Sequence, residues 1–365
     1  MRTSGARVLS TIVALAVCAV SGGALARDRT LQNACFSAEA LGALPGERVI
    51  AKGDRRFDMK KLPVETQPAV AIAPEMRGAI RRVDLPGGEK LIALTFDLCE
   101  QRGEVAGYDG DLIDTLRREN VRATLFAGGK WMRSHQARTQ QLMTDPLFEI
   151  ANHSDTHHNM RKLEGAALQD QILAPQRTFE AIRTGLAATQ CAAKAPDGLQ
   201  SVAPRLTLFR FPFGACNPIA LKAVNDAGLL AIQWDSSTGD PDRNQSAEAI
   251  ANAIVHRTKP GSIIIAHANG RGWNTAAALP IAIPKLKALG YTFVTVSELL
   301  ARGKPVIEAT CYDRKPGDTD RYDFPGGLKP AAAVGGDVHA LQPDGTAKTL
   351  RGRRSSYEPS VFKPL

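Results

Sequence analysis

The strongest constraint on the fold is an alternation of two patterns between about residue 90 and residue 300. Short apolar runs typical of buried strands occur at residues 91–96, 122–127, 147–151, 208–211, 229–234, 262–266 and 291–296. Segments with helical periodicity occur between them, at residues 111–119, 134–143, 164–184, 218–227, 246–257 and 276–289. This alternation predicts an α/β fold of parallel strands joined by helical crossovers. Seven strands in about 210 residues favour a closed or nearly closed barrel over an open sheet.

The flanking segments lack this alternation. Residues 27–87 have scattered proline and charge and are expected to be an N-terminal extension laid over the core. Residues 303–365 are rich in proline, glycine and charge, which predicts a loose and largely disordered C-terminal tail. The expected catalytic domain therefore spans residues 88–302.

Residues 1–26 have the organisation of a secretory signal peptide. Arg2 and Arg7 precede an apolar run at residues 8–20, and Ala24 and Ala26 provide the small side chains of a cleavage site. The apolar run is too short for a comfortable membrane span. We expect an exported protein, periplasmic or secreted, with no stable membrane anchor after cleavage.

Net charge restricts the partners only weakly. The formal charge of +9 becomes +7 without residues 1–26, because 44 basic residues then face 37 acidic ones. A basic excess of this size suits anionic polymers or membranes. Lys and Arg do not cluster with aromatic residues, so no nucleic-acid partner is expected. The sequence indicates no particular oligomeric state.

Five of the six cysteines follow the signal segment, so at least one thiol is free or paired between chains. Export permits disulfides. Cys99 and Cys216 both follow predicted strand ends, so we predict one bond between them. A second bond, between Cys35 and Cys311, would join the two flanking segments.

Titratable side chains follow three of the predicted strands. Asp97 and His267 each end an apolar run, and His153 follows a third. The carboxyl ends of barrel strands meet on one rim, so we predict one shared site. His153 and His157 are four residues apart, and a helical turn there would place both imidazoles on one face with metal-ligand spacing. An isolated pair of this kind is more often a solvated helix face, but the other strand ends favour the metal site.

Five motifs in chain order give the sequence a resemblance to a known family. Together they resemble the polysaccharide deacetylase family, whose NodB homology domain is also called carbohydrate esterase family 4, over roughly residues 88–302. The motifs are Thr95-Phe96-Asp97, the pair His153 and His157, Arg210-Phe211-Pro212-Phe213-Gly214, Trp234-Asp235, and His267. The resemblance implies a distorted (β/α)7, TIM-like barrel. It also implies metal-dependent removal of acetyl groups from sugar polymers, usually from N-acetylglucosamine.

The resemblance also implies roles for individual side chains. His153 and His157 would hold a divalent cation that acidifies a bound water and polarises the acetyl carbonyl. Asp97 matches the general base and His267 the general acid. Arg210 matches the arginine that orients the base, although a strand-end salt bridge is the alternative. Asp235 matches an acid that tunes this arrangement.

Two aromatic residues are candidates for substrate contact. The backbone N–H of Phe213 matches an oxyanion donor of the family. Trp234 offers a flat apolar face to a sugar ring, although a tryptophan at such a position is more often part of the core.

One position departs from the family pattern. The family commonly has two consecutive acids after Thr-Phe, the second of which binds the metal, and here that position is Leu98. Three alternatives follow: Glu100 supplies the missing carboxylate, Asp97 itself moves to the metal and leaves Glu100 as the base, or two histidines and water hold the ion weakly. Two imidazoles and a carboxylate would favour zinc or a similar transition metal.

The leading hypothesis is an exported metal-dependent hydrolase that removes acetyl groups, N-acetyl above all, from a polysaccharide or peptidoglycan-type substrate. One alternative is a carbohydrate-binding barrel that lost turnover through the Leu98 change. Another is a hydrolase of O-acetyl esters or small-molecule amides.

Overall fold

The computed structural model describes residues 30–63, 66–323, 340–341 and 347–348. The expected signal peptide and most of the expected tail after residue 323 lie outside these ranges. Among the described helices, none combines the length and the apolar character that crossing a bilayer requires.

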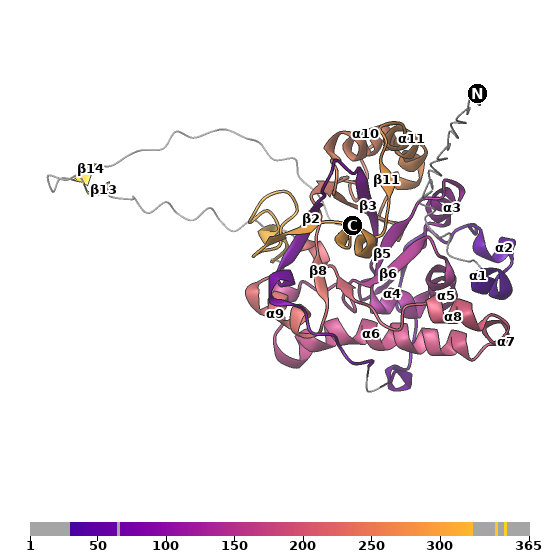
Figure 1. Cartoon of the computed structure of the whole chain (residues 1–365). Helices are drawn as coiled ribbons and strands as arrows, with labels where there is room; N and C mark the ends of the chain where they lie inside the picture. The colour runs from indigo at the N-terminus through magenta and orange to yellow at the C-terminus, as the bar shows by residue number, and fades with distance from the viewer. Residues whose placement is uncertain (1–29, 64–65, 324–339, 342–346, 349–365) are drawn as a thin grey trace, which may run out of the picture.

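One curled sheet forms the centre of the molecule, and helices cover it (Figure 1). Its strands follow the order β12-β2-β8-β7-β6-β5-β3-β10-β9, and β11 pairs with the start of β3. All pairs in this sheet are parallel except β12 with β2. The strands are β2 (Ala79–Asp84), β3 (Leu91–Leu98), β5 (Ala123–Ala127), β6 (Phe148–Asn152), β7 (Leu208–Phe209), β8 (Leu230–Ile232), β9 (Ser236–Ser237), β10 (Ile263–His267), β11 (Thr292–Phe293) and β12 (Lys304–Glu308).

Two short antiparallel pairs lie outside this sheet. Strand β1 (Ala51–Lys52) pairs with β4 (Glu104–Val105), and β13 (Ala340–Leu341) pairs with β14 (Ala347–Lys348).

The two sides of the curled sheet approach each other between β2 and the start of β10. The Val83 N–H donates to the Gly261 carbonyl over 2.9 Å, and Arg82 forms an isolated bridge with Ser262. Gly261 has a φ of 82°, and a Cβ there would lie 1.7 Å from the Val83 carbonyl oxygen. Only glycine permits this approach, which curls the sheet into a distorted barrel.

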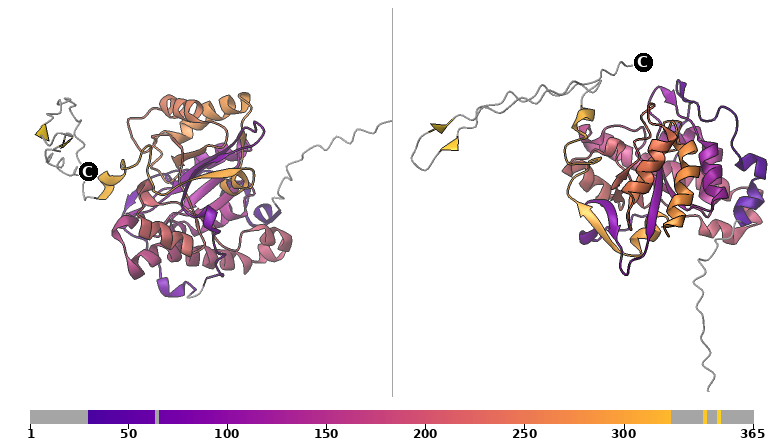
Figure 2. Two further views of the ribbon diagram at one scale, coloured as in Figure 1. Left: turned by 60° about the vertical axis from the view of Figure 1, so that its left-hand side comes forward. Right: turned by 90° about the horizontal axis from the view of Figure 1, so that it is seen from above.

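Helices form the crossovers and the outer layer, and several begin at capping side chains. Asp109, Asn217 and Ser246 each accept a hydrogen bond from a backbone N–H of the first turn, and Thr295 forms a capping box with Glu298. Figure 2 shows α10 and α11 packed side by side. The helices are α1 (Thr30–Cys35), α2 (Ala38–Leu41), α3 (Gly110–Arg118), α4 (Gly129–Ser134), α5 (Gln136–Thr144), α6 (Gly165–Ala187), α7 (Gln190–Ala193), α8 (Pro196–Ser201), α9 (Pro218–Asp226), α10 (Ala247–Arg257), α11 (Thr275–Ala288) and α12 (Val296–Leu300).

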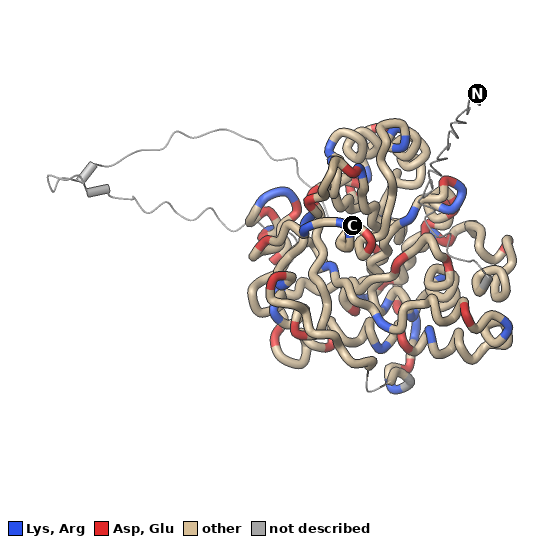
Figure 3. Tube along the Cα trace, in the orientation of Figure 1, with Lys and Arg blue, Asp and Glu red and all other residues tan. Residues whose placement is uncertain are grey.

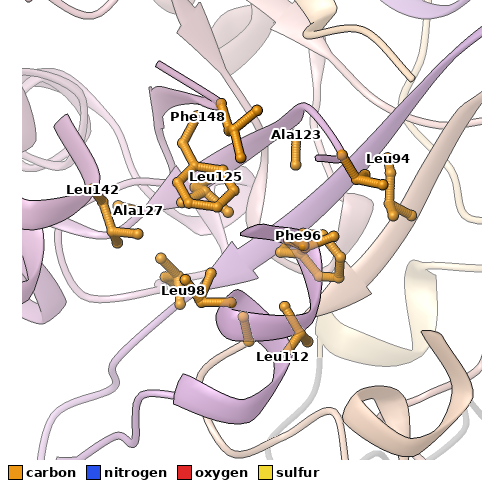
Figure 4. Packing of buried hydrophobic residues seen from close by; sticks show 14 of the residues in the cluster. Leu94, Phe96, Leu98, Leu112, Ala123, Leu125, Ala127, Leu142 and Phe148 are labelled. Atoms are coloured by element: carbon orange, nitrogen blue, oxygen red, sulfur yellow. The ribbon is translucent and has the colours of Figure 1, made fainter. Parts of the chain in front are cut away.

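The central strands are continuous apolar runs in the sequence because they are buried in the core. Residues 92–98 of β3 are all buried, as expected for a parallel strand covered on both faces. Leu94, Phe96 and Leu98 point into one cluster with Leu112 of α3 and Leu125 of β5 (Figure 4). The residues between them, Thr95 and Asp97, face the other side of β3.

The α/β barrel class predicted from sequence is confirmed, and each of the seven predicted strands is found. The strands predicted at residues 208–211, 229–234 and 291–296 are shorter than predicted. The prediction missed β2 and β12, which extend the sheet on both sides of residues 88–302. Residues 303–323 were expected to begin a loose tail, but they contain β12 and pack on the domain.

Both predicted disulfides are wrong. Cys35 of α1 pairs with Cys191 of α7, and Cys216 pairs with Cys311. Cys216 and Cys311 share an outer apolar cluster, whereas Cys99 is buried as a free thiol beside the histidine pair. A common position at strand ends therefore did not bring Cys99 and Cys216 together.

Candidate active site

The carboxyl ends of the parallel strands surround a cavity of about 890 Å³. Asp97 and His267 are direct partners in the register of β3 and β10. His153 follows β6, and Arg210 follows the neighbouring strand β7. The cavity is lined in part by Asp97, Cys99, His157, Phe213, Trp234, Asp240, His267, Arg271, Asp313, Arg314, Lys315 and Tyr322.

Asp97 is held by a fully buried arginine. The Arg210 guanidinium donates to Asp97 Oδ1 over 2.9 Å and to Thr95 Oγ1 over 2.8 Å, and it stacks 3.8 Å from the Phe126 ring centroid. Burial favours the neutral acid, but His153, Arg210 and His267 together outweigh it and lower the pKa of Asp97. The carboxylate is therefore ionised at neutral pH and fixed in orientation.

His267 is oriented by an acid that the sequence analysis did not single out. His267 Nδ1 lies 2.9 Å from Asp240 Oδ1, and the His267 backbone N–H donates to Asp240 Oδ2 over 2.7 Å. Thr238 and Thr275 hydroxyls also donate to this carboxylate. Burial alone would lower the pKa of His267, but the carboxylates of Asp240 and Asp97 together outweigh burial and raise it. The bond at Nδ1 leaves Nε2 as the ring nitrogen available to a ligand.

Asp235 does not join this group. It lies at the level of the start of β10, where it accepts hydrogen bonds from Ser262 Oγ and the Ile263 N–H, both over 3.0 Å. The structure therefore separates Asp235 from Asp97 and places Asp240 beside His267 instead. Asp240 lies in a loop without periodicity, and only the Thr238-Gly-Asp-Pro turn signal marked it.

The two histidines of the predicted metal pair meet, although they lie in a loop and the expected helical turn is absent. Their ring centroids are 5.0 Å apart. Ser154 and His157 both have left-handed backbones, with φ of 63° and 52°. Such strain in residues other than glycine is characteristic of functional loops. Arg133 binds the Asp155 carboxylate with two nitrogens and so anchors the loop.

The ring nitrogens of this pair suit a metal ion. The Arg210 carbonyl oxygen lies 2.9 Å from His153 Nδ1 and can only accept, so Nδ1 carries the proton and Nε2 has a free lone pair. His153 Nε2 and His157 Nδ1 are buried without a hydrogen-bond partner. Burial lowers the pKa of His153 and lowers that of His157 well below its usual range, so both rings are neutral at pH 7. Neutral imidazoles with free buried lone pairs are what a divalent cation requires.

Cys99 Sγ belongs to the same set of ligand atoms. It, His153 and His157 each offer an atom, and these atoms all lie within 4.8 Å of one another. Burial raises the pKa of the Cys99 thiol to about 12. Without a cation, the sulfur is therefore protonated.

The position after Asp97 faces away from the cavity. Leu98 is fully buried in the apolar cluster of β3 and β5. Glu100 is also removed from the histidines, because it accepts hydrogen bonds from Lys130 Nζ, Ser134 Oγ and the Ala106 N–H. The structure thus excludes Glu100 as the missing carboxylate and as a substitute base.

The two aromatic candidates both line the cavity. Phe213 has a φ of 60°, and its ring contacts His157 edge-on at a centroid distance of 4.5 Å. Trp234 is only 4% exposed and packs against Gly214, where an added Cβ would come within 2.7 Å of its ring. Trp234 is therefore a wall of the cavity more than an open platform.

Residues 309–323, here called the strap, form another wall. Cys311 joins the strap to Cys216, and Arg81 donates to the carbonyls of Tyr312 and Asp313 over 2.6 and 2.8 Å. Trp234 Nε1 donates to Asp313 Oδ1 over 2.9 Å.

The far end of the strap is fixed by polar and aromatic contacts. Arg161 pairs with Asp320 and Asp323, and Tyr322 stacks on Phe213 at 4.9 Å. Charged stretches of both signs mark these loops in Figure 3. The strap is therefore part of the site, which its composition did not reveal.

Comparisons with known proteins found one matching family and several relatives. The sequence profile described as polysaccharide deacetylase matches residues 84–201. A peptidoglycan-N-acetylglucosamine deacetylase from Bacillus cereus is 31% identical over 219 residues, which cover 60% of this chain and 91% of that protein. A bifunctional xylanase/deacetylase from Pseudobutyrivibrio xylanivorans is 31% identical over 214 residues, or 58% of this chain and 30% of that protein. The crystal structure of a CE4 family pseudoenzyme from Bacillus anthracis has the same fold, with a TM-score of 0.50 and 24% identity over 62% of this chain and 70% of that one.

Proposed function

Since this chain belongs to the polysaccharide deacetylase family, we propose that it is an exported, metal-dependent hydrolase that removes N-acetyl groups from a peptidoglycan-type polysaccharide. One observation carries the proposal. The Asp97–Arg210 and His267–Asp240 pairs lie at one cavity, which His157 also lines, and His153 Nε2 lies 3.4 Å from Asp97 Oδ2. Both imidazoles are buried with free lone pairs. An amide hydrolase needs a base, an acid and an electrophile around one carbonyl.

His153 and His157 would hold the cation, which supplies Lewis acidity to the acetyl carbonyl and to a bound water when present. Asp97 is ionised and accepts the proton of the attacking water. Arg210 keeps its carboxylate oriented during this transfer.

His267 acts at the opposite side of the reacting bond. Its raised pKa keeps a proton on Nε2 near neutral pH, while Nδ1–H remains bonded to Asp240. His267 gives the Nε2 proton to the departing amine as the carbon–nitrogen bond breaks. Water and amide are thereby converted to acetic acid and amine. Asp97 then returns its proton to solvent and His267 takes one up, so both side chains regain their starting protonation.

The strap supports an acidic polymer as substrate. Arg314 and Lys315 are exposed and line the cavity. The Asp318 carboxylate nearby is occupied by the backbone N–H groups of residues 313–315. On the strap side of the cavity, Arg314 and Lys315 attract polymers with carboxylates, as peptidoglycan has and chitin has not, while the exposed Asp242 on the same cavity carries the opposite charge.

Acetate release from N-acetylglucosamine oligomers and from peptidoglycan tests the function. His153→Ala should abolish release, and His267→Ala should lower kcat by about 10²–10⁴-fold, the usual contribution of a general acid. His256→Ala, on the exposed end of α10, is the matched control and should leave kcat unchanged. Equal activity of all three variants would refute the mechanism.

The position of Leu98 favours one second candidate, a carbohydrate-binding barrel without turnover. A stoichiometric metal with no acetate release from N-acetyl, O-acetyl or small amide substrates would support it. Turnover of any of the three substrate classes would exclude it.

A further inference from the structure

We propose that Cys99 completes the metal site, so that a thiolate and two imidazoles hold the cation in place of the carboxylate that Leu98 cannot supply. This proposal rests on the metal dependence proposed above. The three ligand atoms, from Cys99, His153 and His157, lie within 4.8 Å of one another. Zinc binds sulfur at about 2.3 Å and imidazole at about 2.0–2.1 Å, so one ion can reach all three after a small contraction.

Cys99 directly follows β3, and the alternation of that strand, continued by one residue, accounts for the position of the thiol. Successive side chains of a strand point to opposite faces, so Asp97 and Cys99 share the face toward the cavity and Leu98 points into the apolar core. Cys99, two residues after Asp97, therefore reaches the metal site, whereas Leu98 does not. Asp97 Oδ1 remains bound to Arg210, and Asp97 Oδ2 lies 3.4 Å from His153 Nε2, but Asp97 is not a member of the set of mutually close ligand atoms.

Two independent observations mark these atoms as ligands. His153 Nε2 and His157 Nδ1 are buried without a hydrogen-bond partner, although buried polar atoms are nearly always hydrogen-bonded. A fully buried amide also serves the sulfur, because Asn269 Nδ2 lies 3.0 Å from Cys99 Sγ and 2.6 Å from the Cys99 carbonyl oxygen. Outer hydrogen bonds of this kind orient a metal-binding thiolate and stabilise its charge.

The donor set defines the class of metal. One thiolate and two neutral imidazoles carry a single negative charge, as two imidazoles and one carboxylate do. Sulfur and imidazole select borderline-soft cations such as Zn²⁺ and Co²⁺ over Mg²⁺ and Ca²⁺. On binding, the sulfur–metal bond replaces the S–H bond, and the proton leaves to solvent.

Cobalt substitution tests the ligand directly. The full-length protein is stripped of metal and loaded with Co²⁺, and the absorption spectrum is recorded. A sulfur-to-cobalt charge-transfer band in the near ultraviolet is expected for the wild type and for Asp97→Asn. Cys99→Ser and Cys99→Asp should lose the band, whereas His256→Ala, at an exposed histidine at the end of α10, is the control and should keep it.

Zinc affinity gives a second readout. Cys99→Ser should raise the Kd for Zn²⁺ by at least the roughly 10–100-fold that follows loss of an outer-shell partner. Cys99→Asp should restore much of the affinity, and circular dichroism checks that both variants fold.

The outcomes separate this proposal from the proposed function. If wild-type protein releases acetate but shows no thiolate band, and Cys99→Ser binds Zn²⁺ as tightly as wild type, the Cys99 proposal is refuted and the hydrolase stands. If the band is present but no acetate is released, the metal site stands and the hydrolase fails. A weaker Zn²⁺ affinity in Asp97→Asn, with the affinity of Cys99→Ser unchanged, would assign the third ligand to Asp97.

Discussion

Replacing Asp240 with asparagine should move the alkaline limb of the pH–activity profile to lower pH. A hydrogen bond to a charged group contributes about 1.5–3 kcal/mol and a neutral one about 0.5–1.5, so the substitution removes about 1–1.5 kcal/mol that favours protonated His267. At 1.36 kcal/mol per pKa unit, the pKa of His267 should fall by about one unit. His267 acts as an acid, so activity is lost as pH rises through this pKa, and the loss should begin about one unit earlier in the variant.

Three measurements make the test specific. Initial rates of acetate release, measured across a range of pH, give the alkaline limb of the kcat/KM profile. NMR titration of the His267 ring gives its pKa without turnover. Asp240 also accepts bonds from two threonine hydroxyls, so an amide there should cost about 1–3 kcal/mol of unfolding free energy, which urea denaturation measures.

Asp242→Asn is the matched control, because Asp242 is an exposed acid lining the same cavity and lies two residues away. The alkaline limb of the pH–activity profile of Asp242→Asn should not move. An unchanged limb and an unchanged ring pKa in Asp240→Asn would refute the role given to this acid.

Three further outcomes are expected. Arg210→Met strands the buried Asp97 carboxylate and should cost about 3–5 kcal/mol of unfolding free energy; a loss below about 1 kcal/mol in urea denaturation would contradict the buried pair. Cys311→Ser removes the disulfide to Cys216, which closes a loop of 95 residues, so it should lower the unfolding free energy by up to about 4–5 kcal/mol. The variant should also raise KM more than it lowers kcat, and an unchanged KM would show that the strap does not contribute to substrate binding. Arg314→Ser should raise KM for peptidoglycan at low salt and leave KM for neutral N-acetylglucosamine oligomers unchanged; equal effects on both substrates would remove the basis for an acidic polymer.

Local patterns predicted the strands because the central ones are buried on both faces and are therefore apolar throughout. The same patterns placed Asp97, His153 and His267 on one rim, since parallel strands share a carboxyl edge. The contact between β2 and the start of β10, which brings the two sides of the sheet together, was not predicted. Val83 meets Gly261 through a close backbone approach, for which the sequence carries only the glycine.

Some functional side chains that lie in loops were not predicted from the sequence. Asp240 lies in an irregular loop, so no period pointed it toward His267, and the sequence offered no partner for that histidine. Cys99 was assigned to a disulfide although a spacing of two from Asp97 in a strand already implied a shared face. The partner of Cys311 depended on how the strap folds back, which is a tertiary property.

Anomalous diffraction from crystals of the zinc-loaded protein measures the central point most directly. We expect one strong zinc peak at the mouth of the barrel, within bonding distance of His153 and His157 and in the same cavity as Asp97 and His267. A protein that binds zinc only elsewhere, with the imidazoles at 153 and 157 free of metal, would contradict the proposed catalytic centre.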